Sequence, residues 1–280
     1  MQIIKTISDL RQALKAHRQN SERIALVPTM GALHEGHLSL VRLAKKHADC
    51  VVMSVFVNPT QFNDKKDLAT YPRDLEADIK NAEAVGVDLV FAPEVNEMYS
   101  QQSGISTSVQ AGDCAEGLCG SKRPGHFNGV VTVVSMLFNI VNPDYAVFGE
   151  KDYQQLMVIR QMVDTMHYPI EIIAAPIIRE ESGLALSSRN QLLSTEDKKR
   201  ACIISKTLFA AQSAVKNGES SAAAIKSQVE SKLKDAGFII DYVEVMHPTK
   251  LHSIEKIEGG AQLLVAVFLG EVRLIDNVRL

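Results

Sequence analysis

Two histidines three residues apart, His34 and His37, combine side-chain type and spacing in a way that suits phosphate chemistry. They follow an apolar run, Ile24 to Thr29, and open a helical pattern, while Gly31 and Gly36 let the backbone approach a ligand closely. The first turn of a helix presents unpaired N–H groups and a partial positive charge, and both favour phosphate oxygens. We therefore expect the imidazoles to donate hydrogen bonds to a triphosphate, and either ring to carry a proton as charge develops on leaving pyrophosphate.

Two other interpretations of this histidine pair stay open from the residues alone. The rings can cap the helix or lie at the surface without a chemical role. A zinc site is the second alternative, but it needs further ligands, and no cysteine stands at a convincing spacing for them. The sequence therefore leaves any metal ligands unidentified.

An amide pair, Asn58 and Gln61, follows the next apolar run, Val51 to Asn58. An amide offers both a donor and an acceptor, so it can bind a hydroxyl or a carboxylate oxygen without adding charge. A turn begun by the Asn-Pro dipeptide, with no ligand, is the plainer alternative.

Two charged segments could meet the same anion. Lys151 follows the apolar run Tyr145 to Glu150 and is a long cation able to follow a triphosphate, while Asp152 could hold a ribose or a Mg²⁺-bound water. Further on, the string Leu186 to Arg189 offers two hydroxyls and a guanidinium, which suits phosphate. Solvated polar loops are the alternative for both segments.

Strand and helix patterns alternate through the first part of the chain, which predicts an α/β fold with a doubly wound, Rossmann-like parallel sheet. The expected strands are 24–29, 51–58, 88–93 and 145–150, and the expected helices are 37–48, 70–85, 128–141 and 152–166. Such a sheet brings the segments that follow its strands to one edge, where ligands bind.

The pattern changes after about residue 180. A helix is expected from Ser194 to about Asn217 and another over roughly 220–236, followed by strands at 239–247, 262–269 and 271–275 in a small antiparallel sheet. We place a domain boundary between 176 and 186. The expected domains are therefore 1–177, which binds the nucleotide and a small acid, and 178–280, a smaller α+β domain acting as a lid.

Composition excludes several classes of protein. The chain has 280 residues, 46% of them hydrophobic, which is ample for a buried core. Thirty basic and 33 acidic residues give a net charge of -3, which argues against a dedicated nucleic-acid binder. Apolar runs are far shorter than the roughly 20 residues of a membrane span. Four cysteines without a secretion signal suggest free thiols in a reducing, cytoplasmic compartment.

These motifs together resemble the pantothenate synthetase family. Thr29 to His37 resembles that family's version of the H-x-G-H signature of a nucleotidyltransferase superfamily, although Glu35 stands where the broader pattern is usually apolar. Phe148 to Gln155 resembles its F-G-x-K-D-x-Q-Q block, and Leu186 to Arg189 resembles a K-M-S-K-S counterpart without the lysines. The likeness covers nearly all of residues 1 to 190 and, more weakly, the rest. Lys122 to Phe127 resembles another family block to which we assign no role.

The resemblance implies a ligase that joins pantoate to β-alanine through pantoyl-adenylate, releasing AMP and diphosphate, in pantothenate and coenzyme A biosynthesis. ATP would be a substrate accompanied by Mg²⁺, and the protein would be a homodimer without nucleic-acid or membrane partners. The implied catalytic residues are His34, His37 and Lys151. The implied ATP-binding residues are Met30, Gly31, Ala32, Leu33, His34, Glu35, Gly36, His37, Gly149, Glu150, Lys151, Asp152, Ile178, Leu186, Ser187, Ser188 and Arg189. The implied pantoate-binding residues are Asn58, Gln61 and Gln155, with apolar Pro28, Met30 and Val57 against the methyl groups.

Two rival functions stay open at this point. One is a simple nucleotidyltransferase, in which AMP remains on the product. The other is a nucleotide-binding or RNA-binding protein that has lost catalysis, although the sequence offers it no basic patch.

Overall fold

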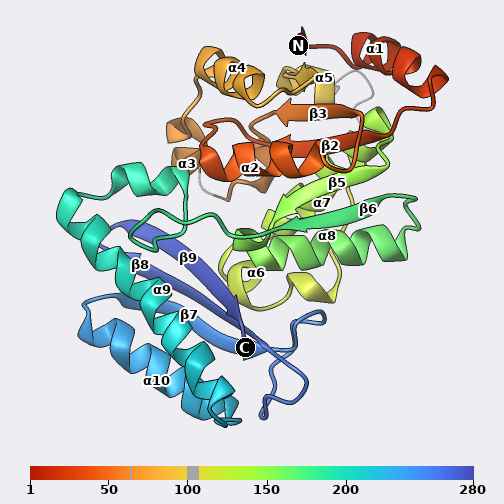
Figure 1. The fold of residues 1–280 in the computed structure, drawn as a ribbon. Helices are drawn as coiled ribbons and strands as arrows, with labels where there is room; N and C mark the ends of the chain where they lie inside the picture. The colour runs from red at the N-terminus through yellow and green to blue at the C-terminus, as the bar shows by residue number, and fades with distance from the viewer. Residues whose placement is uncertain (64, 100–106) are drawn as a thin grey trace. The chain divides into compact units, whose positions relative to one another are not determined.

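The computed structural model describes residues 1–63, 65–99 and 107–280 (Figure 1). The chain divides into two compact units, the first made of residues 1–150 and 158–176 and the second of residues 151–157 and 177–280. Helix α8 (Tyr153–Thr165) therefore contributes its first residues to the second unit and the remainder to the first. That residues 178–280 act as a lid stays a prediction.

The first unit is built on a parallel sheet, as predicted. Among the described residues it has six strands in the order β1-β4-β3-β2-β5-β6, and every neighbouring pair is parallel. The strands are β1 (Gln2–Ile4), β2 (Ile24–Thr29), β3 (Cys50–Val55), β4 (Leu89–Phe91), β5 (Tyr145–Gly149) and β6 (Glu171–Ala175). The sequence did not predict β1, which has three residues, or β6, whose side chains are mostly half-buried at an edge.

Both faces of this sheet are covered. The evidence is that successive residues of the central strand β2, whose side chains point to opposite faces, are buried. Ala25 and Val27 of β2 pack in one cluster with Val41 of α2 (Glu35–Ala44). Leu26 lies between them, so its side chain projects to the other face, and it is also fully inaccessible. This double burial explains why the central strands are almost continuously apolar.

The first unit contains further helices, which range from short turns to one long helix whose side chains are mostly buried. Its other α-helices are α1 (Ile7–Gln19), α3 (Lys65–Thr70), α4 (Leu75–Ala84), α5 (Val95–Met98), α6 (Leu118–Lys122) and α7 (His126–Val141). Its single 3₁₀ turns are η1 (Pro59–Gln61) and η3 (Asp113–Ala115), while η4 (Glu150–Asp152) spans the division between the units.

The prediction of one helix over residues 70–85 was wrong. Helix α3 ends at Thr70 and α4 begins only at Leu75. Pro72 lies between them and has no N–H to donate, so it cannot continue α3. Asp74 then starts α4 as its cap, with Oδ1 accepting the N–H of Ala77 at 3.0 Å.

The second unit has the predicted helices and antiparallel sheet. Its elements are η5 (Ser188–Leu192), α9 (Thr195–Lys216), α10 (Ala222–Asp235), β7 (Ile239–Met246), β8 (Gln262–Leu269) and β9 (Val272–Arg279). In the described part of the chain the strands pair antiparallel in the order β7-β8-β9. Ser194 caps α9 as expected, with its hydroxyl accepting the N–H of Asp197 at 3.0 Å. Strand β9 runs four residues beyond the predicted end at 275.

Aliphatic side chains from α9, α10 and all three strands form the core of this unit. Leu208 and Ile225 are completely inaccessible there, and Val267 of β8 packs in the same cluster. Burying three such side chains is worth roughly 5 to 9 kcal/mol before entropy is counted. The unit therefore has a hydrophobic core of its own.

Within residues 1–63, 65–99 and 107–280, no helix is both long enough and apolar enough to cross a lipid bilayer.

Candidate functional site

In the first unit, the candidate residues gather where the direction of strand connection reverses. Strands β2 and β5 are parallel neighbours, yet β3 lies beyond β2 on one side and β6 lies beyond β5 on the other. Ligands of open α/β sheets bind at the carboxyl ends of the strands at such a point. Met30 to His37 follow β2 and Gly149 ends β5, so both segments lie there.

The histidine pair is a reciprocal cap of helix α2. His34 Nδ1 accepts the N–H of Gly36 at 3.1 Å, and His37 Nδ1 accepts the N–H of His34 at 3.3 Å. The two ring centroids are 4.1 Å apart. Because a backbone N–H can only donate, each Nδ1 must be unprotonated, and a neutral ring carries its hydrogen on Nε2. Both rings therefore cap the start of α2, whatever further role they have.

A buried carboxylate, Asp78 of α4, holds the turn before these histidines. Its oxygens accept the N–H groups of Ala32 at 3.0 Å and Leu33 at 2.7 Å. Gly31 has a φ of +82°, and a Cβ at this position would lie 2.6 Å from Asp78 Oδ2. Burial raises the pKa of Asp78, while the two N–H donors act in the opposite direction. Ala32 and Leu33 are among the residues expected to bind ATP, and their backbone N–H groups are already bonded within the protein.

The amide pair after β3 is buried and fixed in orientation. Asn58 Oδ1 accepts the N–H of Thr60 at 3.3 Å and the hydroxyl of Tyr99 at 2.7 Å. Asn58 Nδ2 must therefore be the donor to Gly129 O at 3.0 Å and to Gln61 Oε1 at 3.2 Å. Because Gln61 Oε1 accepts this hydrogen bond, the amide nitrogen Nε2 of Gln61 donates to a different partner.

Gln61 joins this second segment to the first. Its Nε2 lies 2.9 Å from the sulfur of Met30, which immediately follows β2. An open cavity of about 410 Å³ lies beside Met30 and is lined further by Val57, Asp78 and Arg73. Met30 and Val57 are two of the apolar residues expected to hold the methyl groups of a small acid.

In the second unit, three of the candidate phosphate-binding residues surround one small cavity. Lys151, Ser187 and Arg189 line a space of about 20 Å³, which is room for about one water molecule. Asn190 lines it as well, and its buried Oδ1 has no hydrogen-bond partner among the described residues. Lys151 Nζ lies 3.5 Å from the carboxylate of Asp152.

The loop that carries these hydroxyls is closed by backbone contacts. Ile178 O accepts the N–H of Leu186 at 2.9 Å, so these two predicted ATP-binding residues lie side by side. Ser187 caps η5, with its Oγ accepting the N–H of Arg189 at 3.3 Å. The side chain of Arg189 is exposed.

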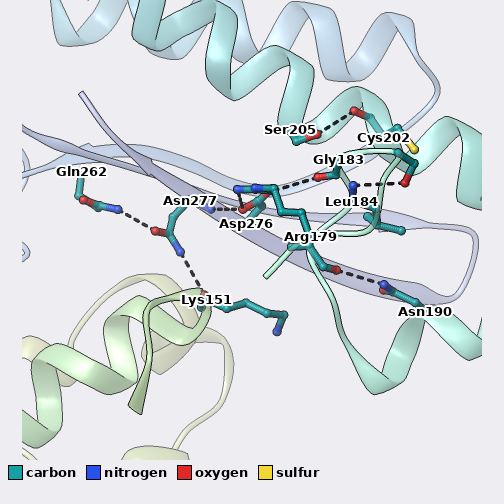
Figure 2. Close-up of polar contacts among 12 residues, drawn as sticks. Lys151, Arg179, Gly183, Leu184, Asn190, Cys202, Ser205, Gln262, Asp276 and Asn277 are labelled. Carbon is teal, nitrogen blue, oxygen red and sulfur yellow. Dashed lines mark hydrogen bonds and ion pairs between the residues drawn. The ribbon is translucent and has the colours of Figure 1, made fainter. Parts of the chain in front are cut away.

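Strand β9 supplies the polar contacts that fix this loop and the lysine turn (Figure 2). Arg179 forms two hydrogen bonds with Asp276, at 2.6 and 2.8 Å, and also donates to Gly183 O at 3.1 Å. Asn277 Nδ2 donates to Lys151 O at 3.1 Å. Its Oδ1 accepts from Gln262 Nε2 at 2.7 Å, which fixes the orientation of the amide.

Comparison with known proteins decides the family. The family model described as pantoate-beta-alanine ligase matches residues 2–279. The chain belongs to this family. A pantothenate synthetase from Acetivibrio thermocellus is 50% identical over 279 residues, covering 99% of each chain. One from Desulfitobacterium hafniense is 50% identical over 278 residues, covering 99% of this chain and 98% of the relative.

Solved structures of the pantothenate synthetase family have the same fold. The Thermus thermophilus enzyme superposes with a TM-score of 0.93 at 45% identity, over 99% of each chain. The pantoate-beta-alanine ligase of Francisella tularensis, crystallised with beta-gamma ATP and β-alanine, gives a TM-score of 0.79 at 34% identity. That comparison covers 99% of this chain and 97% of the other.

For this family member, the sequence-predicted residues thus fall into two groups. The first unit brings together Met30 to His37, Asn58 to Gln61 and Gly149. The second unit holds Lys151, the half-buried Gln155 of α8, and the loop with Ile178 and residues 186–189.

The sequence did not predict the residues that support both groups. Asp78 bonds to the turn before the histidines, and Asp276 and Asn277 of β9 bond to Arg179 and to the lysine turn. An acidic residue in an apolar stretch, as at Asp276, was the available signal, since a buried carboxylate needs a partner.

Proposed function

We propose that the chain performs the ligation of its family in two steps. The carboxylate of pantoate attacks the α-phosphate of ATP, forming the mixed anhydride pantoyl-adenylate and releasing diphosphate. The amine of β-alanine then attacks the acyl carbon, loses a proton and expels AMP, which leaves pantothenate. The observation that supports this best is the histidine pair at the strand reversal, with the uncharged Gln61 amide joined to the same segment through Met30.

The first unit would bind pantoate and the reacting phosphates. Nε2–H of His34 and of His37 would donate to phosphate oxygens, and His37 would stabilise the diphosphate as it leaves. Gln61 would bind an oxygen of pantoate through its Nε2 amine, because Asn58 occupies its Oε1. An uncharged donor suits this task, since it orients the pantoate carboxylate without neutralising the charge that attacks phosphorus.

The second unit would supply positive charge. Lys151 and Arg189 would bind the triphosphate, with Ser187 and Ser188 donating from their hydroxyls. The cavity of about 20 Å³ beside them is too small for a nucleotide, so ATP would contact the exposed side of these groups. Ile178 and Leu186 would contact the adenine, and Gln155 would bind pantoate.

Magnesium would accompany ATP. Among the described residues no three His, Cys, Asp or Glu side chains form a cluster able to hold a metal ion. Mg²⁺ in such enzymes is held largely by substrate phosphates and water, with one or two carboxylates, so the donor set is compatible with it. Asp152, exposed and next to Lys151, is the carboxylate that we propose for a magnesium-bound water.

The decisive experiment is pantoate-dependent pyrophosphate exchange. With pantoate present and β-alanine absent, labelled pyrophosphate should appear in ATP, and adding β-alanine should release AMP and pantothenate in equal amounts. Exchange that does not require pantoate, or a product that retains AMP, would instead identify a nucleotidyltransferase and overturn the proposal. RNA binding without ligation would support the non-catalytic alternative.

Two properties of the family are also proposed for this chain, a homodimeric state and a cytoplasmic location. The buried thiols of Cys50 and Cys202 suit a reducing compartment, and burial with the nearby Asp88 carboxylate raises the pKa of Cys50 to about 12. Sedimentation equilibrium tests the first property, because a monomer at micromolar concentration contradicts it. Fractionation of the producing cells tests the second.

A further inference from the structure

The segment Lys122 to Phe127 has no part in the proposed mechanism, yet it contacts the turn that carries Gln61. Gly125, in the left-handed region at φ +78°, precedes α7, and His126 is the first residue of that helix. The His126 side chain is buried. Its Nδ1 lies 2.7 Å from the carbonyl oxygen of Gln61, and its Nε2 lies 3.1 Å from Arg123 Nη1.

The chemistry of these two partners fixes the position of the imidazole hydrogen. A carbonyl oxygen can only accept a hydrogen bond, and a guanidinium can only donate one. His126 makes both contacts only as a neutral ring with its hydrogen on Nδ1 and its lone pair on Nε2. Arg123 thereby selects the tautomer that donates to Gln61.

The same helix fixes the Gln61 turn at a second point. Gly129 O accepts Asn58 Nδ2 at 3.0 Å, and Asn58 in turn donates to Gln61 Oε1 at 3.2 Å. A Cβ on Gly129 would lie 2.5 Å from Thr60 O and 2.7 Å from Gln61 N, so the helix backbone packs directly on the turn. One turn of α7 therefore holds both the main chain and, through Asn58, the amide of Gln61.

We propose that His126 is a positioning residue for substrate recognition. It holds the backbone carbonyl of Gln61 so that the side-chain amide N–H of Gln61 can donate to an oxygen of the hydroxy-acid substrate. This inference rests on the proposed role of Gln61. It assigns Arg123 the task of selecting the His126 tautomer. It also gives the 122–127 block a function without direct contact to substrate.

The kinetic test compares two variants of His126. His126→Leu removes the donor, and the KM for pantoate should rise about tenfold or more while the KM for ATP stays within about twofold. His126→Asn places an amide N–H near the position of Nδ1, so the KM for pantoate should return to within about threefold of wild type. Equal increases in both KM values, or no rescue by asparagine, would show a merely structural role and overturn the inference.

A matched control variant and a double-mutant cycle of His126 with Gln61 separate this inference from the proposed function. Ser135→Ala removes another buried polar group of α7, whose hydroxyl lies 3.1 Å from Met162 Sδ, and it should not change the KM for pantoate. If Gln61→Ala leaves the KM for pantoate normal, the proposed role of Gln61 is wrong. If Gln61→Ala raises it but His126→Leu does not, only the positioning inference fails. In the double variant, His126→Leu should add less than twofold to the effect of Gln61→Ala.

Nitrogen-15 NMR of the folded, histidine-labelled protein provides a test that does not depend on activity. The His126 ring should show a hydrogen on Nδ1 and a bare Nε2 at neutral pH. A hydrogen on Nε2, or a doubly protonated ring, would contradict the contact with Arg123 and the inference with it.

Discussion

The turn around Gln61 and the turn around Lys151 hold their polar groups in contrasting ways, and both are proposed to serve one reaction. At Gln61 the working group is a buried, uncharged amide whose donor and acceptor ends are both set by neighbours. At Lys151 the working groups are long cations, with Arg189 exposed and Lys151 only partly buried. The first turn is supported by neutral hydrogen bonds from α7, and the loop bearing Arg189 by the partly buried ion pair of Arg179 with Asp276.

This contrast matches the ligands proposed for each turn, a small hydroxy acid for Gln61 and a triphosphate for Lys151 and Arg189. A small hydroxy acid is distinguished from its relatives by the direction of a few hydrogen bonds, which requires a donor fixed before binding. A triphosphate carries dispersed charge that moves during reaction, and a flexible cation can follow it. A fixed amide therefore favours specificity, whereas mobile cations favour charge stabilisation.

The largest expected effect concerns the ion pair that supports the cationic group. Arg179→Met leaves the Asp276 carboxylate, 3% exposed, without its cation, so the free energy of unfolding should fall by about 3 to 5 kcal/mol. In the neutral network, Asn58→Ala should cost less, about 1 to 3 kcal/mol. Urea denaturation measures both. As a control, Lys234→Met breaks the exposed pair with Glu230 and should change stability by no more than about 0.5 kcal/mol.

The histidine turn of the first unit and the lysine turn of the second are both proposed to act in the adenylation step. His37→Ala and Lys151→Ala each remove a proposed phosphate-binding group, and each should lower the adenylation rate on the order of a hundredfold or more, by analogy with oxyanion-hole deletions of about 3 to 4 kcal/mol. Pantoate-dependent pyrophosphate exchange measures this rate. Lys232→Ala, on the exposed face of α10, is the matched lysine control and should be silent. Near-normal exchange in both test variants would remove these motifs from the mechanism.

The pH dependence of stability tests Asp78, the buried carboxylate that holds the turn before the histidine pair. Burial raises the pKa of Asp78 above its ordinary value of 3.8, so the folded protein binds this proton more tightly than the unfolded chain does. The contribution of Asp78 to stability should therefore fall as pH rises from 3.8 through the folded pKa. Asp78→Asn does not titrate, so the stability of wild type relative to this variant should decrease over that window.

Urea denaturation at a series of pH values measures the difference, with Glu83→Gln on the exposed side of α4 as the control. Parallel profiles for wild type and Asp78→Asn would show that Asp78 does not titrate differently on folding.

The smallest expected effect concerns the support of Lys151. Asn277→Ala removes the hydrogen bond to Lys151 O, which is a neutral contact worth about 1 kcal/mol, so exchange should slow about fivefold. The exchange rate at saturating pantoate is the measurement. Gln212→Ala removes another amide contact to a β9 carbonyl, that of Arg279, and should not change the rate. An unchanged rate in Asn277→Ala would mean that the lysine turn needs no support from β9.

Local patterns predicted much of the fold. Strand β2 occupies the predicted residues, and the cap of α9 at Ser194 was read directly from its serine and the acidic residues after it. Both features depend on neighbours along the chain. The break at Pro72 is equally local, and the prediction of one helix over 70–85 did not take it into account. The strand and helix alternation was sufficient to predict a parallel sheet, and the histidine pair follows β2 at the carboxyl edge of that sheet.

The partners of the functional groups were decided only by the tertiary structure. Asp78 reaches Ala32 across 46 positions of sequence, and Asn277 reaches Lys151 across 126. Periodicity shows which face of an element is buried, but a buried polar group can bond with any complementary group that packing brings within about 3 Å. The sequence by itself therefore determined which side chains could do the chemistry, while the tertiary structure decided which residues hold them in place.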